Sequence, residues 1–117
     1  MKTSTFGVGL VALLHIGFFI LESMMWRSPE VMAIFDNTTA SAEATYLLAL
    51  NQGFYNLGAA ILLLWFHYSK NGPAVMAVLA FLFCMGLVGG VTANGSIVLV
   101  QSLPALLALV FLYDRTS

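Results

Sequence analysis

Two ionisable side chains stand in the first apolar stretch of the sequence, where they could carry out acid–base chemistry. His15 and Glu22 are seven positions apart, nearly two turns of a helix, so both should point to the same side. Their backbones would be about 10 Å apart, so a direct hydrogen bond is not expected. Because structure alone rarely needs an acid and an imidazole together inside a membrane, we treat both as candidate functional residues.

Four further hydrogen-bonding side chains fall within six positions of the chain. Asn51 and Tyr55 share one face of a predicted helix, and Gln52 and Asn56 share the adjacent face. Each would be costly against lipid tails, so we expect all four to point into a helix bundle. There they either bind a ligand or only fix the helices together through hydrogen bonds.

Counting residues along the predicted helices places the polar side chains in one half of the membrane, about 6 to 16 Å below its outer edge. The inner half is nearly pure hydrocarbon, apart from His67 near its boundary. This layering predicts a polar pocket that opens away from the cytoplasm. The candidate ligand-binding residues are His15, Glu22, Trp26, Asn51, Gln52, Tyr55, Asn56 and Gln101.

The composition shows what must position these residues. The 117 residues are 61% hydrophobic and only 8% charged, whereas a soluble domain carries about 25% charged residues. The net charge of −1 gives no reason to expect nucleic acid as a partner. Membrane lipid is the expected surrounding partner, and the single cysteine, Cys84, excludes an intramolecular disulfide.

Three long stretches lack any charged residue, and each is too long for a strand of a membrane barrel, about 10 residues. The last stretch, residues 71–113, suits two spans of about 20 residues with a break in the glycine-rich segment 89–96. We therefore predict an all-α, polytopic membrane four-helix bundle that forms a single transmembrane domain over residues 1–117. The predicted helices are approximately Phe6–Met25, Ala44–Tyr68, Ala74–Thr92 and Ile97–Tyr113.

The connection from Trp26 to Glu43 contains a helix-start signal, Ser28 followed by Pro29. Apolar residues then recur at helical spacing. This pattern predicts a short amphipathic helix at the membrane surface, between the first and second long helices. It would act either as a connector or as a lid over the bundle.

The distribution of cations predicts the orientation of the chain. With four spans, Lys2, Lys70 and Arg115 share one side, and only Arg27 lies on the other. This bias favours cytoplasmic termini in a multi-pass membrane protein.

Metal and cofactor chemistry receive no support from the sequence. His15 is expected deep in the membrane and His67 near its inner face, and no spacing typical of a metal site is present. We therefore predict no metal site and no cofactor.

The residues resemble a known family, the small bacterial membrane proteins of domain-of-unknown-function family 1304. The resemblance covers nearly the whole chain, and the string at residues 51–56 is its most specific part. It rests on Leu14-His15, Leu21-Glu22, Trp26 followed by Pro29, Phe35, residues 51–56, Gln101 and Pro104-Ala105-Leu106. Members often have a glutamate immediately before the histidine, where this chain has Leu14. The resemblance implies a four-helix integral protein of the bacterial inner membrane, and it implies no activity.

Three functions remain open. The favoured one is binding or transport of a small amphipathic molecule in the polar pocket. The second is an intramembrane enzyme in which Glu22 and His15 act as acid and base. The third is a structural or accessory membrane protein. Small-residue pairs such as Gly86 with Gly90 let helices approach closely within one chain or between chains, so a homo-oligomer is also compatible.

Overall fold

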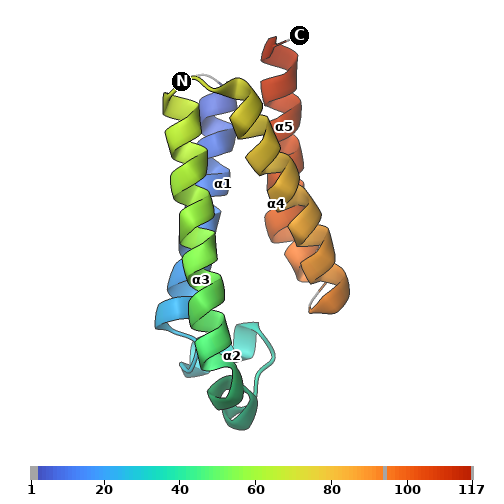
Figure 1. Cartoon of the computed structure of the whole chain (residues 1–117). Coiled ribbons are helices and arrows are strands. Elements are labelled where there is room, and N and C mark those ends of the chain that lie inside the picture. The colour runs from blue at the N-terminus through green and yellow to red at the C-terminus, as the bar shows by residue number, and fades with distance from the viewer. Residues whose placement is uncertain (1–2, 94, 117) are drawn as a thin grey trace. The chain divides into compact units, whose positions relative to one another are not determined.

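The structure, a computed structural model, describes residues 3–93 and 95–116, with side chains up to Leu112. All regular secondary structure in these ranges is helical, which confirms the predicted all-α class (Figure 1). The elements are α1 (Thr3–Phe19), η1 (Ile20–Met24), α2 (Pro29–Ile34), α3 (Thr39–Tyr68), α4 (Gly72–Thr92), η2 (Val98–Ser102) and α5 (Leu103–Thr116), where η1 and η2 are short π-helical stretches.

Within the described ranges, three helical stretches are long and apolar enough to cross a membrane. They are Thr3–Met24, Thr39–Tyr68 and Gly72–Thr92. The fourth apolar stretch, Val98–Leu112, is shorter. It would extend about 22 Å, against about 30 Å for a hydrocarbon core. Three of the four predicted spans are therefore long and apolar enough to cross a membrane.

The chain forms two compact units, which are described separately. The first unit contains residues 3–14 and the described residues after position 58, and the second unit is His15–Gly58. Both α1 and α3 contribute residues to each unit. A single transmembrane domain over residues 1–117 stays a prediction.

In the first unit, α4 packs against η2 and α5 (Figure 1). Small residues permit this close approach. A Cβ atom on Gly89 would lie 3.1 Å from Ile97, and one on Gly90 would overlap Val98. The N-terminal part of α1 approaches α5 in the same way, because a Cβ on Gly7 would lie 3.3 Å from Ala108.

The second unit contains the short helix predicted between the first two long helices. The Ser28 side chain accepts a hydrogen bond from Val31 N at 3.3 Å, and Pro29 occupies the first turn of α2. Val31 is fully buried, which fixes one side of α2. The helix stops near Asp36, whose φ of 56° is a left-handed conformation that aspartate tolerates.

Helix α3 begins at Thr39, five residues before the predicted start at Ala44, and contains 30 residues. Thr38 and Ser41 cap it reciprocally. Ser41 N donates to Thr38 Oγ1 at 3.0 Å, and Thr38 N donates to Ser41 Oγ at 2.9 Å. Because these bonds satisfy the free amides of the first turn, helix formation starts earlier than hydropathy alone indicates.

The fourth predicted helix is not uniform. It starts near Ile97 as expected, but residues Val98–Ser102 are π-helical before α5 continues. Pro104 stands two positions after this stretch and cannot donate a hydrogen bond to the preceding turn. A wider turn before the proline is one way in which a helix accommodates that loss.

Candidate functional site

A carboxylate–amide pair joins two helices within the second unit. Asn56 Nδ2 on α3 donates a hydrogen bond to Glu22 Oε1 on η1 at 2.5 Å. Both side chains are half-buried. Two of the eight predicted site residues are thereby joined across two helices, although they are 34 positions apart in sequence.

The spacing of buried residues on α3 explains why Asn56 is the amide that reaches Glu22. Ala49 and Leu63 are buried, and Asn56 lies midway between them at a seven-residue interval. Gly53 and Ala60 form a parallel buried series, also seven residues apart. Such a repeat defines one stripe of a helix, and Asn56 belongs to it.

Next to this pair, a serine packs into the space left by a glycine. Ser23 Oγ donates to the Leu50 carbonyl oxygen at 2.9 Å. A Cβ on Gly53 would overlap Ser23 Oγ and lie 3.0 Å from Ser23 N. Glycine is therefore required at position 53 for η1 to lie this close to α3. We call this arrangement the first serine–glycine contact.

Aromatic side chains lie before and after Glu22 in the sequence, at Phe19 and Trp26. Phe19 and Phe54 meet edge to face with ring centroids 5.1 Å apart. Trp26 Nε1 donates to Thr45 Oγ1 at 3.0 Å, and its ring packs on Phe35 at 4.9 Å. The predicted residue Trp26 is thus held in position by contacts to both α3 and the segment that follows α2.

Three of the predicted site residues lie on exposed faces of α3. Asn51 and Gln52 are exposed, and Tyr55 is 69% exposed. The expectation was that they would point inward together with Asn56. Within the second unit, the stripe that contains Gly53 faces η1, and these three side chains fall beside that stripe rather than on it. Their inward orientation stays a prediction.

His15 is only 1% exposed, and its ring meets Phe18 edge to face at 5.1 Å. It is therefore enclosed, as predicted for a deep polar residue.

Gln101 belongs to the first unit, where η2 lies against α4. Its Nε2 donates to the Leu82 carbonyl oxygen at 3.0 Å. The next residue, Ser102, donates from Oγ to the Phe83 carbonyl oxygen at 2.8 Å. A Cβ on Gly86 would overlap Ser102 Oγ and lie 2.9 Å from Ser102 N. We call this the second serine–glycine contact.

The two serine–glycine contacts have the same design. In each, a π-helical stretch presents a serine to a glycine on a neighbouring helix, and the serine bonds the carbonyl three residues before that glycine. In each, the residue before the serine carries a long polar side chain, Glu22 in one case and Gln101 in the other. The two units therefore use one packing arrangement with a different polar group.

That difference reverses the direction of hydrogen bonding. The Gln101 amide donates to a backbone carbonyl, whereas the Glu22 carboxylate accepts from Asn56. An ionised carboxylate can only accept hydrogen bonds. The arrangement in the first unit shows that a neutral amide is enough for the packing, so packing alone does not require an acid at position 22.

Arg27, the only arginine or lysine of the second unit, is already engaged. Its Nη1 lies 3.2 Å from Glu43 Oε2, and its guanidinium lies 4.0 Å from the centre of the Tyr46 ring. The same unit carries four carboxylates, at Glu22, Glu30, Asp36 and Glu43. The second unit is therefore acidic.

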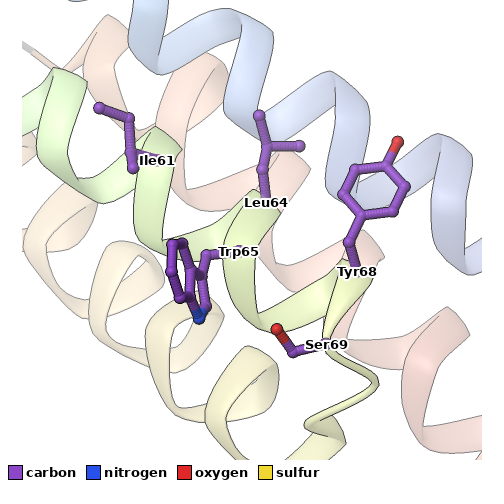
Figure 2. A pocket seen from close by; sticks show the side chains of 5 residues that line it. All are labelled: Ile61, Leu64, Trp65, Tyr68 and Ser69. Carbon is purple, nitrogen blue, oxygen red and sulfur yellow. The ribbon is translucent and has the colours of Figure 1, made fainter.

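The first unit has a shallow hollow near the end of α3, shown in Figure 2. None of its lining residues is a predicted site residue. It is lined by Ile61, Leu64, Trp65, Tyr68 and Ser69. Trp65 and Tyr68 are largely exposed, as aromatic side chains at a membrane interface commonly are.

No group of three or more histidine, cysteine or acidic side chains that could hold a metal occurs among the residues that were described.

Comparison with known families completes this description. Residues 9–113 match the family described as "Protein of unknown function (DUF1304)". The chain belongs to this family. All eight predicted site residues fall inside the matched range, and the resemblance inferred from the sequence is confirmed. The family description specifies no activity. No curated protein and no solved structure matches the chain.

Sequence reasoning missed the residues that let the helices approach. These are the two serines and two glycines of the serine–glycine contacts. A usable signal exists, because the pairs Glu22-Ser23 and Gln101-Ser102 are chemically alike and each packs on a glycine. A search of the sequence for internal similarity would have identified these two pairs as equivalent.

Proposed function

We propose that this family member is an integral membrane protein that binds the polar head of a small amphipathic molecule at the Glu22–Asn56 pair. The observation that carries the proposal is the carboxylate itself, half-buried in an apolar helix at a place where an amide suffices for packing. An ionisable group inside a spanning segment is costly, so its presence favours a functional role.

The pair retains capacity for a ligand. A carboxylate offers about four lone-pair sites. Among the described residues, Glu22 accepts one hydrogen bond, from Asn56. Donor groups of a ligand head could occupy further sites on the same carboxylate.

The surroundings suit the apolar part of such a molecule. Phe54 is 55% exposed and packs on Phe19, close along the chain to Glu22. Exposed Asn51 and Gln52 lie on the same helix and add amide donors and acceptors. A site with a few polar groups among apolar side chains is the usual composition of a small-molecule site.

The proposal includes a membrane arrangement. The chain would sit in the bacterial inner membrane as a four-helix bundle with cytoplasmic termini, and the Glu22–Asn56 pair would lie in the outer half. Lys2, Lys70 and Arg115 on one side, against Arg27 on the other, support this orientation. Association of two or more copies stays a prediction.

The test uses side-chain amide signals in nuclear magnetic resonance. The purified, ¹⁵N-labelled protein in nonionic micelles is titrated with three probes of equal chain length: octanol, octylammonium and octanoate. We expect at least one probe to shift the Asn56 amide signal to saturation, and Glu22→Gln to weaken that response.

Gln101 provides the internal control, because its amide occupies the matching place in the first unit. A ligand site at Glu22 should leave the Gln101 signal unsaturated and nearly constant. If the Asn56 and Gln101 signals move together and linearly with all three probes, the probes only partition into the micelle and the proposed function is wrong.

A structural role is the second candidate, and one observation favours it. Ser23, Ser102 and Gln101 all donate to backbone carbonyls of a neighbouring helix, which fixes helix pairs without any ligand. The titration separates the two candidates, because a purely structural centre would show no saturable probe response.

A further inference from the structure

We propose that the head group bound at Glu22 is cationic, and specifically that it is an alkylammonium. This inference rests on the proposed function and adds the charge and hydrogen-bonding character of the ligand. Three separate features of the second unit lead to it: the acceptor chemistry of the pair, the engagement of the local arginine, and the aromatic side chains nearby.

The first feature is the direction of hydrogen bonding. Asn56 uses its amide nitrogen on Glu22, so a donor of the protein already approaches one carboxylate oxygen. The remaining lone pairs of the carboxylate can only accept. The ionised form of Glu22 therefore calls for a ligand head that donates, and an ammonium donates while also carrying the opposite charge.

The second feature is the charge balance. Arg27 is the single cation available within the second unit, and Glu43 and Tyr46 hold its guanidinium. Among the described residues of this unit, Glu22 therefore has no cationic side chain for itself. The excess of carboxylates in the unit attracts cations and repels anions.

The third feature is aromatic. Phe19 and Phe54 pack against each other, three positions before Glu22 and two before Asn56 in the sequence, and Phe54 keeps more than half of its surface exposed. The face of an aromatic ring attracts an ammonium within about 6 Å. The same rings would contact the alkyl chain, so one small region could serve both ends of an alkylammonium.

The contrast with the first unit supports this assignment. There, Gln101 stands at the place of Glu22 and donates its own amide to Leu82. A neutral, donating group at that place would not attract a cation. The two serine–glycine contacts thus provide an acidic and a neutral version of one arrangement in a single molecule.

The experiment compares head groups in the wild-type protein first, so it does not depend on any variant folding. In the Asn56 titration, we expect octylammonium to bind about tenfold or more tightly than octanol, and octanoate to bind most weakly. Octyltrimethylammonium, which has the charge but no N–H donor, should fall between octylammonium and octanol.

Two variants then locate the charge. Glu22→Gln should remove about tenfold in octylammonium affinity and leave octanol nearly unchanged. Glu30→Gln removes an exposed carboxylate from the same unit and should change the affinity by less than about twofold. Equal losses in both variants would mean a diffuse attraction to the acidic unit, which would overturn the assignment.

The outcomes for the two proposals remain distinct. If octanol or octanoate saturates the Asn56 signal as tightly as octylammonium, the protein binds amphipathic molecules but the head group is not cationic. If no probe saturates that signal, both proposals fail.

Discussion

Ser23 occupies the space that a side chain at position 53 would need. Its Oγ is close enough to overlap with a Cβ built on Gly53, and its backbone nitrogen is 3.0 Å from that Cβ. The same relationship holds between Ser102 and Gly86. These two close approaches bring the polar residues before each serine against a neighbouring helix.

The first prediction concerns these glycines. Gly53→Ala and Gly86→Ala should each destabilise the protein by about 1–3 kcal/mol, because the added methyl group meets a serine and its backbone. Gly58→Ala is the matched control on α3, since nothing lies within 4 Å of its Cβ. It should be neutral or stabilising by about 0.5–1 kcal/mol.

The measurement is unfolding of the purified protein in mixed micelles with increasing SDS, followed by circular dichroism. The double variant Ser23→Ala with Gly53→Ala should recover part of the loss, because the overlapping oxygen is gone. Equal stability of Gly53→Ala and Gly58→Ala would show that η1 does not lie this close to α3.

The second prediction concerns the Glu22–Asn56 pair. Asn56→Leu should destabilise the protein more than Glu22→Gln, because it leaves a half-buried carboxylate without its amide donor. Glu22→Gln keeps a side-chain carbonyl oxygen that can still accept from Asn56. A double-mutant cycle should give a coupling energy of about 0.6 kcal/mol and no more than about 1.7 kcal/mol.

The same SDS unfolding assay reports the four stabilities. Strict additivity of the two substitutions would mean that Glu22 and Asn56 do not interact in the membrane protein, and the site would lose its central contact.

The third prediction concerns Trp26. Thr45→Val removes the acceptor of the indole N–H and should cost about 1 kcal/mol. In a Trp65→Phe background, the remaining tryptophan fluorescence comes from Trp26 alone, so its emission should shift. Thr92→Val is the control. The Thr92 hydroxyl donates to the Val88 carbonyl oxygen of its own helix, but no indole N–H donates to it among the described residues. An unchanged Trp26 emission in Thr45→Val would contradict the contact.

Much of the fold could be predicted because lipid imposes simple rules. The charge-free stretches identified the long helices, and the cap at Ser28 with Pro29 located α2. The start of α3 was placed too late, because hydropathy does not register the reciprocal bonds between Thr38 and Ser41. At this position the capping hydrogen bonds, rather than the apolar content, decide where the helix begins.

The candidate site was predicted in part. The association of Glu22 with the polar cluster of α3 was expected, and the structure realises it through Asn56. The inward orientation of Asn51 and Gln52 was inferred from the cost of exposing amides to lipid. That orientation stays a prediction, but Gly53 selects the face of α3 on which η1 can lie, and Asn51 and Gln52 are not on that face. The small residues Gly53 and Ala60 on α3 indicate in the sequence which face of the helix lies against its neighbour.

The π-helical turn η1 behaves as an α-helix that holds one surplus residue. Loss of any one residue from Ile20–Met24 could restore regular winding without breaking the helix. The segments on either side of the turn would then keep their relative orientation, because only the surplus residue is removed. The residues inside the turn would change face, and Glu22 and Ser23 both reach α3 from this turn. The length of the turn is therefore as much a part of the site as the side chains on it.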